Sequence, residues 1–161
     1  MAVDPEELRV AMRKWATGVT IVSASYQGVS HGMTVNSFAS VSLEPPTVLI
    51  SMSRDSRTHA LVLASGAFAV TFLKSDQQEL SELFAGRLPD DEDRFAGLTV
   101  HTLTTGSPFL TGGLAFLDCR VIATHAAGTN TLVIGEVVAA RSTEEGLPLL
   151  YYDRHYREMQ D

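Results

Sequence analysis

The stretch over residues 31–58 reads HGMTVNSFASVSLEPPTVLISMSRDSRT and carries two clusters of small hydroxyl residues, at 32–40 and at 51–58. Between the clusters, Pro45-Pro46 predicts a turn, and the apolar and β-branched residues 47–50 predict a buried strand. One strand is therefore expected to carry short hydrogen-bond donors at both of its ends.

Such donors indicate a particular kind of ligand. Backbone amides, hydroxyl groups and arginines that converge on a concave surface suit a flat, polyfunctional molecule with a phosphate tail. The second cluster contains two arginines, Arg54 and Arg57. Both are expected to be either plain surface charges or contacts to such a ligand, and Arg54 is favoured of the two because it directly follows the strand end.

Length and charge limit the possibilities. A chain of 161 residues can bury one sizeable core but not two ordinary ones, so we expect a single domain over residues 1–161. A formal net charge of −7 leaves no basic surface for a nucleic-acid partner. With Cys119 as the sole cysteine, no internal disulfide is possible, and a reducing cytoplasm is expected. No basic segment precedes an apolar one at the start, and no apolar run reaches the roughly 18 to 20 residues of a membrane span.

The first residues predict a helix. Asp4 is a suitable N-cap, and Pro5 suits the first helical position. Leu8, Met12 and Trp15 follow at helical spacing, and this apolar stripe is expected to face the core, with a ligand wall as the alternative.

Most of the remaining pattern predicts strands, at 19–24, 29–38, 47–52, 67–73, 100–103, 113–125 and 131–140. Short helices are expected at about 57–64, ending at Gly66, and after an Asp76 cap, where Leu80, Leu83 and Phe84 share one side. Gly128-Thr129-Asn130 is expected to close a long hairpin. Six or seven strands with few helices favour a mainly-β barrel or an α+β fold over a doubly wound sheet.

Residues 86–93 form a polar, strongly acidic segment. A segment of this kind is expected either to act as a lid over a site or to be a plain solvated loop.

Several catalytic motifs are missing from the sequence. It contains no His-Glu-x-x-His, no Cys-x-x-Cys, no Gly-x-Ser-x-Gly and no Gly-x-Gly-x-x-Gly after a strand. Zinc, dithiol, serine-hydrolase and Rossmann chemistry are therefore not indicated, and no metal ligand is predicted. Cys119 lies on an apolar strand face, where a buried, inert thiol is expected rather than a nucleophile.

Six blocks follow one another along the chain: ATGVTIV at 16–22, GMTVNSF at 32–38, SVSLEPP at 40–46, SGAFAV at 65–70, IGEV at 134–137 and PLLYY at 148–152. Together they resemble the short-chain flavin reductase family, whose fold is the FMN-binding split barrel, an antiparallel Greek-key barrel. The resemblance covers nearly the whole chain, and the order and spacing of the blocks make it specific.

The resemblance implies a homodimer that binds FMN or FAD and reduces it by hydride transfer from NADH or NADPH. The reduced flavin would then serve a partner flavin-dependent monooxygenase. In this chemistry the cofactors carry the reaction and the protein supplies orientation, so no side chain is predicted to be catalytic. The alternative is a non-catalytic flavin-binding electron carrier or sensor of the same fold.

The resemblance also implies site residues. The isoalloxazine ring would be lined by Thr34, Val35, Asn36 and Ser37. The ribityl chain and phosphate would be held by Ser51, Met52, Ser53, Arg54, Ser56 and Thr58. Two further residues, Ala85 and Arg94, would reach the phosphate or the adenosine side.

One departure from the family pattern concerns the last hairpin. Family members commonly have a Gly-Asp-His turn whose histidine helps to seat the nicotinamide, whereas this chain has Gly128-Thr129-Asn130. Asn130 can still donate a hydrogen bond to a carboxamide, although it has no titrating group. Tyr152 is a second candidate for the nicotinamide pocket, with a core role as the alternative.

Overall fold

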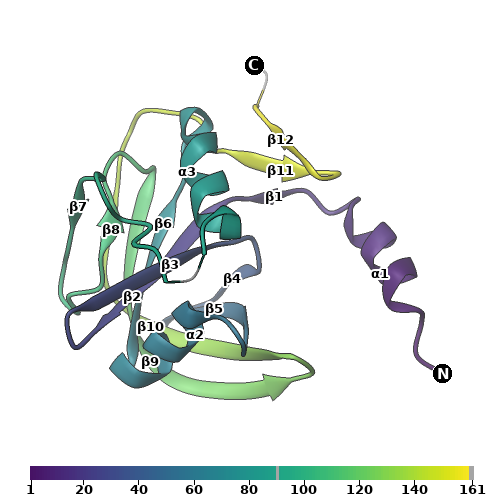
Figure 1. The fold of residues 1–161 in the computed structure, drawn as a ribbon, viewed down its shortest axis with the longest axis horizontal. Helices are drawn as coiled ribbons and strands as arrows, with labels where there is room; N and C mark the ends of the chain where they lie inside the picture. Colours follow the sequence, from purple (N-terminus) through teal and green to yellow (C-terminus); the bar gives the residue numbers. More distant parts are fainter. Residues whose placement is uncertain (90, 160–161) are drawn as a thin grey trace.

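The computed structural model describes residues 1–89 and 91–159, and strands dominate it (Figure 1). Within these residues the main sheet comprises β2 (Thr20–Tyr26), β3 (Val29–Val35), β4 (Phe38–Leu43), β5 (Pro46–Ser53), β6 (Ala67–Phe72), β9 (Ala115–Ala127) and β10 (Asn130–Ser142). A smaller sheet contains β1 (Thr17–Gly18), β11 (Leu150–Tyr152) and β12 (His155–Arg157), and β7 (Val100–His101) pairs with β8 (Phe109–Leu110). The helical segments are α1 (Pro5–Met12), α2 (Arg57–Ser65), η1 (Ser75–Gln77), α3 (Gln78–Glu82) and η2 (Leu83–Arg87).

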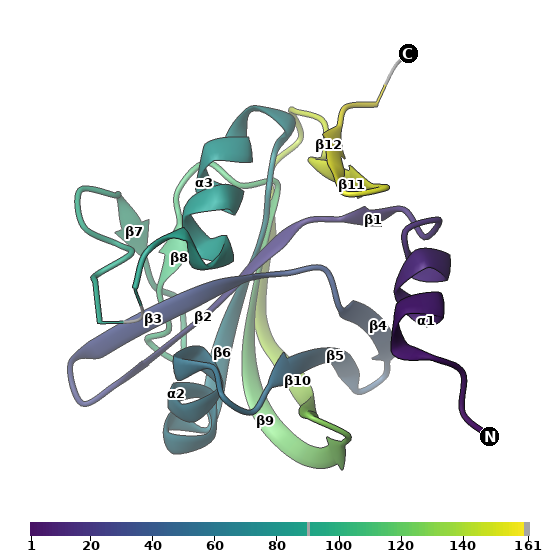
Figure 2. The same ribbon diagram turned by 45° about the vertical axis from the view of Figure 1, so that its right-hand side comes forward.

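The main sheet curls into a barrel. Its strands are antiparallel and follow the order β3-β2-β6-β9-β10-β5-β4. The edge strands β3 and β4 are consecutive in the chain and are joined only by Asn36 and Ser37. The end of β3 and the start of β4 therefore lie close together, and we call this connection the seam of the barrel (Figure 2). This arrangement confirms the expected mainly-β barrel, whereas the single strand predicted over 29–38 is wrong because the chain changes sheet edge at the seam.

The barrel interior is apolar and tightly closed. Val22, Ile50, Phe68 and Val133 are each 0% exposed and belong to one cluster. Val62 of α2 joins this cluster, so the helix covers that part of the barrel. As predicted, α2 ends at Gly66, whose φ of 67° is a left-handed conformation that glycine adopts without strain.

The expected burial of Cys119 is confirmed. The residue is fully buried in the barrel cluster. Burial, with a smaller contribution from the Asp118 charge, raises the pKa of its thiol to about 12. A thiol that stays protonated is a poor nucleophile, so Cys119 is a core residue.

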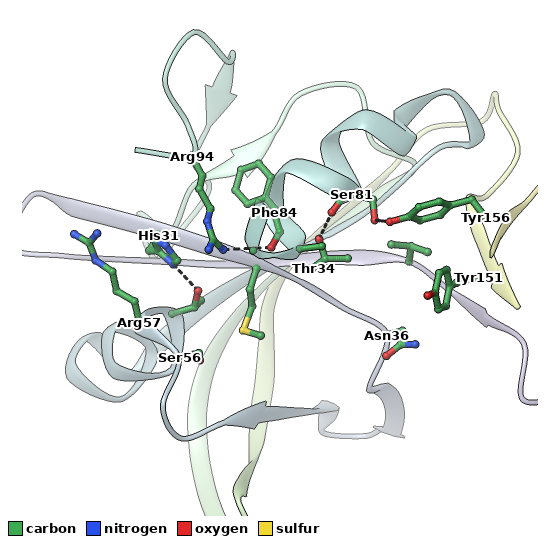
Figure 3. Close-up of a pocket in the computed structure, with 15 residues that line it drawn as sticks. His31, Thr34, Asn36, Ser56, Arg57, Ser81, Phe84, Arg94, Tyr151 and Tyr156 are labelled. Atoms are coloured by element: carbon green, nitrogen blue, oxygen red, sulfur yellow. Dashed lines mark hydrogen bonds between the residues drawn. The ribbon is translucent and has the colours of Figure 1, made fainter. Parts of the chain in front are cut away.

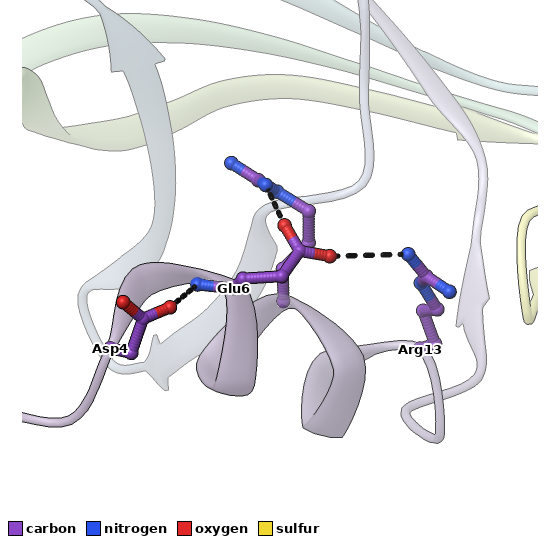
Figure 4. Close-up of polar contacts among 4 residues, drawn as sticks. Asp4, Glu6 and Arg13 are labelled. Atoms are coloured by element: carbon purple, nitrogen blue, oxygen red, sulfur yellow. Dashed lines mark hydrogen bonds and ion pairs between the residues drawn. The ribbon is translucent and has the colours of Figure 1, made fainter.

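Helix α1 departs from the prediction. Asp4 caps it as expected, since its Oδ1 accepts the Glu6 N–H at 2.8 Å, and Glu6 also pairs with Arg9 and Arg13 (Figure 4). None of its residues is buried, however, and the helix stands away from the barrel (Figure 1). The prediction that Leu8, Met12 and Trp15 face the core is wrong, because helical spacing identifies an apolar face but not what covers it.

The segment after β6 also differs in detail. Asp76 lies inside the 3-10 turn η1, and Lys74 occupies the N-cap, so the predicted Asp76 cap is wrong. Leu80, Leu83 and Phe84 do pack together with a second buried cluster, as predicted. This segment therefore presents its apolar side to the barrel next to β3.

Among the residues that the structure describes, no helix has the length and apolar character needed to cross a bilayer.

Candidate functional site

The seam of the barrel opens into a cavity of about 360 Å³, which we call the seam pocket (Figure 3). Its walls come from β3, the start of α2, the α3–η2 segment and the C-terminal hairpin β11–β12. The described residues that line it are Val19, His31, Met33, Thr34, Asn36, Ser56, Arg57, Thr58, Ser81, Phe84, Ala85, Gly86, Arg94, Tyr151 and Tyr156. The volume lies in the range of small-molecule sites.

One end of the seam pocket is cationic. It contains the N-terminus of α2, where Ser56 is the N-cap and its Oγ accepts the His59 N–H at 3.2 Å. The free amides and dipole of such a helix end favour an anion. Figure 3 shows Arg57, His31 and Arg94 at this same end. Together these groups form a site suited to a phosphate.

Arg94 shapes the cationic end rather than projecting freely into it. The residue is 5% exposed, and its guanidinium donates to the carbonyls of Gly32 at 2.9 Å, Phe84 at 3.2 Å and Leu88 at 3.5 Å. These bonds fasten the turn at 84–88 to β3. The base of the acidic segment is therefore held in place, while Asp90 within it lies outside the described residues.

His31 and Thr58 form a buried polar pair beneath the pocket floor. The His31 Nδ1 and the Thr58 Oγ1 are 2.8 Å apart, and the two residues are 2% and 0% exposed. This contact joins β3 to the first turn of α2. It fixes the spacing between the helix N-terminus and the strand on which a ligand would rest.

The opposite end of the seam pocket is aromatic. The rings of Tyr151 and Tyr156 meet edge to face, with centroids 5.4 Å apart. The Tyr156 hydroxyl and the Ser81 Oγ are 2.8 Å apart, and the Thr34 hydroxyl donates to the Ser81 carbonyl at 2.6 Å. The C-terminal hairpin, α3 and β3 are thereby linked around one end of the cavity, where Asn36 presents its amide (Figure 3).

The structure brings together about half of the predicted cofactor residues. Those that line the seam pocket are Thr34, Asn36, Ser56, Thr58, Ala85 and Arg94. Those that do not are Val35, Ser37, Ser51, Met52, Ser53 and Arg54. Val35 and Met52 are buried in the barrel cluster because strand alternation turns them inward.

The remaining predicted residues lie on the outer side of the sheet, near the hairpin tip. The Ser37 hydroxyl donates to the Ser51 carbonyl at 2.7 Å. The Ser53 carbonyl accepts the Ser56 hydroxyl at 2.9 Å. Arg54 donates through its guanidinium to the Gly128 carbonyl. Arg54 thus ties β5 to the β9–β10 turn, and of the two arginines in the second hydroxyl cluster it is Arg57 that lines the pocket.

The two predicted nicotinamide residues also lie outside the seam pocket. The Asn130 amide donates to the Ser51 Oγ at 3.0 Å, which ties β10 to β5. The ring of Tyr152 lies 6.0 Å from the Lys14 ammonium, and its neighbour Tyr151 faces the pocket instead. Successive residues of a strand point in opposite directions, so the two tyrosines cannot share this wall.

Sequence reasoning missed several lining residues. Ser81 and Tyr156 lie outside every pattern singled out in the sequence. His31 and Tyr151 lie within quoted stretches but were given no site role, because their place at the pocket depends on how distant segments meet. Arg57 did carry a signal. It is the first residue of the helix predicted over about 57–64, and a helix N-terminus is a general anion site.

Within the part of the chain that the structure describes, no group of three or more His, Cys, Asp or Glu side chains is placed to hold a metal ion.

Comparisons with known proteins give a consistent result. The protein-family model described as flavin reductase like domain matches residues 12–160. The chain is 38% identical over 155 residues to the reductase subunit HsaB of a flavin-dependent monooxygenase from Rhodococcus jostii, covering 96% of this chain and 78% of that one. It is 37% identical over 156 residues to the FMN reductase (NADH) RutF 2 of Methylorubrum extorquens, covering 97% and 90%. Among solved structures, the NADH:FAD oxidoreductase SgcE6 of Streptomyces globisporus superposes with a TM-score of 0.92 at 32% identity, covering 100% and 98%.

Proposed function

The chain belongs to the flavin reductase like domain family, and from this premise we propose that it is an oxidoreductase that reduces FMN or FAD with NADH or NADPH. Its reduced flavin would serve a partner monooxygenase, the role that the name of the Rhodococcus jostii relative states for that protein. The observation that carries the proposal is the polarised seam pocket, with a phosphate site at one end and aromatic and amide groups at the other.

The residues present fit a flavin. The N-terminus of α2 with Arg57 would hold the phosphate, since backbone amides and a guanidinium both donate to phosphate oxygens. Thr34 and Asn36 would face the ring, where a hydroxyl and an amide can meet carbonyl and nitrogen atoms. Ala85 and Gly86 have no bulky side chain, which leaves room between η2 and β3.

A bound flavin supplies the acceptor for the hydride of the nicotinamide cofactor. The protein's own contribution is orientation. Arg94 holds the turn at 84–88 against β3, and Tyr156 holds the C-terminal hairpin against α3. Fixed walls of this kind restrict how a ring can lie, and alignment of two reactants is a large part of the rate enhancement in such reactions.

We also propose that the protein is a homodimer, that each copy folds as one domain over residues 1–161, and that it is located in the cytoplasm. Exposed apolar side chains support the dimer. Leu8, Met12 and Trp15 are 56%, 54% and 68% exposed, and Leu43 on β4 is 86% exposed. Apolar groups gathered on a helix without buried residues are typical of a surface that another chain covers. A second copy of this chain is the partner we propose.

A flavin carrier without reductase activity remains the second candidate, and one observation favours it. The Asn130 amide is engaged with the Ser51 Oγ at the position where the family pattern has a histidine. If nicotinamide capture requires that histidine, the chain would bind flavin without reducing it.

The decisive experiment follows NADH and NADPH oxidation at about 340 nm with FMN, FAD or riboflavin. A reductase gives turnover with at least one pair. Tight flavin binding without turnover with any pair would favour the carrier, and no binding of any flavin would refute both. For Asn130→His we expect a changed KM for the nucleotide with the flavin affinity preserved.

The placement of the phosphate is tested by two arginine variants. Arg57→Ala should weaken FMN binding by about tenfold and leave riboflavin binding within about twofold, because only FMN carries the phosphate. Arg54→Ala is the matched control, since Arg54 belongs to the same segment of the chain but does not line the seam pocket. If Arg54→Ala selectively weakens FMN binding and Arg57→Ala does not, the phosphate lies near the hairpin tip instead.

A further inference from the structure

A second hollow adjoins the cationic end of the seam pocket. It has a volume of about 350 Å³, and we call it the acidic hollow. Arg57 lines both cavities. Two pairs of adjacent residues are also divided between the cavities. Ser30 and Asp93 line the acidic hollow, and the residues that follow them, His31 and Arg94, line the seam pocket. Because Arg57 lies between the two cavities, a ligand group that extends from the seam pocket past Arg57 would reach the acidic hollow.

The charge of the acidic hollow is opposite to that of the cationic end. Asp91, Glu92 and Asp93 are consecutive, exposed and line one wall of it. Two local hydrogen bonds hold this acidic turn in place, one from the Glu92 N–H to the Pro89 carbonyl at 3.1 Å and one from the Phe95 N–H to the Asp93 side-chain Oδ1 at 2.9 Å. Charges act over about 10 Å at 0.1 M salt, so the acidic turn influences any anion in the hollow.

The two flavin nucleotides differ in whether they would enter this hollow. FAD is FMN extended at its phosphate by adenosine monophosphate. If the proposed function holds, the first phosphate lies at the N-terminus of α2, and the extension must leave past Arg57. The named relatives include both an FMN reductase and an NADH:FAD oxidoreductase, so membership of the family does not decide between the two nucleotides.

We propose that the acidic turn Asp91–Asp93 makes this protein selective for FMN over FAD by repelling the second phosphate of the dinucleotide. The inference rests on the proposed function, because it takes the seam pocket as the flavin site. FMN and FAD carry nearly the same total charge at neutral pH. A difference in their affinities would therefore arise from the position of the second phosphate near the acidic turn and not from the total charge of the ligand. Asp91 and Glu92 are the specificity-determining side chains, since Asp93 also supports the turn.

The test measures dissociation constants for FMN and FAD by flavin fluorescence at low salt and at 0.3 M NaCl. The protein should bind FMN about tenfold tighter than FAD at low salt. Asp91→Asn combined with Glu92→Gln should tighten FAD binding about fivefold and change FMN binding by less than about twofold. The matched control combines Glu144→Gln with Glu145→Gln, which neutralises two exposed acids elsewhere and should change neither constant.

Salt should narrow the difference between the nucleotides because it screens exposed charges. Equal or tighter binding of FAD by the unchanged protein would overturn the inference and leave the flavin site intact. The inference would also be overturned if the Asp91→Asn and Glu92→Gln double variant bound FAD more weakly, because the two acids would then be contacts for the adenosine. If neither nucleotide binds, the proposed function falls together with the inference.

Discussion

The seam pocket and helix α1 differ in how much of the chain surrounds them. The pocket is enclosed by several segments of the chain, whereas α1 has no buried residue and exposes its apolar side chains. The pocket walls are cross-linked by hydrogen bonds from Arg94 and Tyr156 to distant segments. Helix α1 has ion pairs along one side and no buried residue on the other. The pocket is thus an enclosed space of the size of a small ligand, whereas α1 is the exposed apolar surface on which the proposed homodimer rests.

The comparison is tested first at α1, where the largest effect is expected. Leu8→Glu places a charge on the apolar face, and burying an unpaired charge is costly. The proposed homodimer should then dissociate roughly 100-fold more readily, as measured by sedimentation at several concentrations. Leu63→Glu on α2 is the control, because that leucine is also exposed. A dimer that tolerates Leu8→Glu, or a protein that is monomeric from the start, would contradict the role of α1.

The pocket is tested next through Arg94. Arg94→Ala leaves the buried carbonyls of Gly32 and Phe84 without their guanidinium donor, so the free energy of unfolding should fall by about 2 kcal/mol. Urea unfolding measures this change, and flavin affinity should fall with it. Arg141→Ala removes an exposed arginine and should change stability by less than about 0.5 kcal/mol. Equal effects of the two variants would mean that Arg94 does not hold the pocket.

Cys119 lies in the closed core, away from both the seam pocket and α1, and a third prediction concerns the effect of its buried thiol on stability. The folded thiol has its pKa raised to about 12, against an ordinary value of 9.0. Below pH 9 both states keep the proton, so the thiol adds no pH dependence. Above pH 9 the unfolded state ionises first, and the free energy of unfolding should fall by about 1.4 kcal/mol at pH 10. Cys119→Ala should lack this slope in urea titrations at pH 8 to 10, and an identical slope in both proteins would argue against the raised pKa.

The smallest effect is expected at the aromatic end of the pocket. Tyr156→Phe removes the hydroxyl that meets the Ser81 Oγ and keeps the ring contact with Tyr151. Stability should fall by about 1 kcal/mol, and FMN should bind somewhat more weakly, since the hairpin wall is less firmly held. A larger loss of stability than for Arg94→Ala would reverse the order that the contacts imply.

The difference between the two regions also explains what could be predicted from sequence. Alternation and turn residues correctly predicted the mainly-β class, helix α2 with its Gly66 end, and the β9–β10 hairpin, because these features depend on neighbours in the chain. The spacing of Leu8, Met12 and Trp15 predicted an apolar face equally well. It carried no information about the covering surface, which is why the core assignment failed.

The candidate site shows the same limit. Thr34, Asn36, Ser56 and Thr58 were predicted and do line the pocket, because they flank strand and helix ends. Tyr156 and Ser81 are 75 positions apart and meet only through the packing of the C-terminal hairpin on α3. The choice of Arg54 over Arg57 followed proximity to the strand end. The structure places Arg57, at the N-terminus of α2, on the pocket wall and leaves Arg54 outside it.

The claim at the centre of this account is that the seam pocket binds a flavin nucleotide through the N-terminus of α2. Hydrogen–deuterium exchange over the whole chain, with and without saturating FMN, tests it directly. Protection should rise at residues 31–36, 56–60 and 84–86 and remain unchanged in α1. Protection confined to the hairpin tip at 128–130, or absent from the start of α2, would contradict the claim.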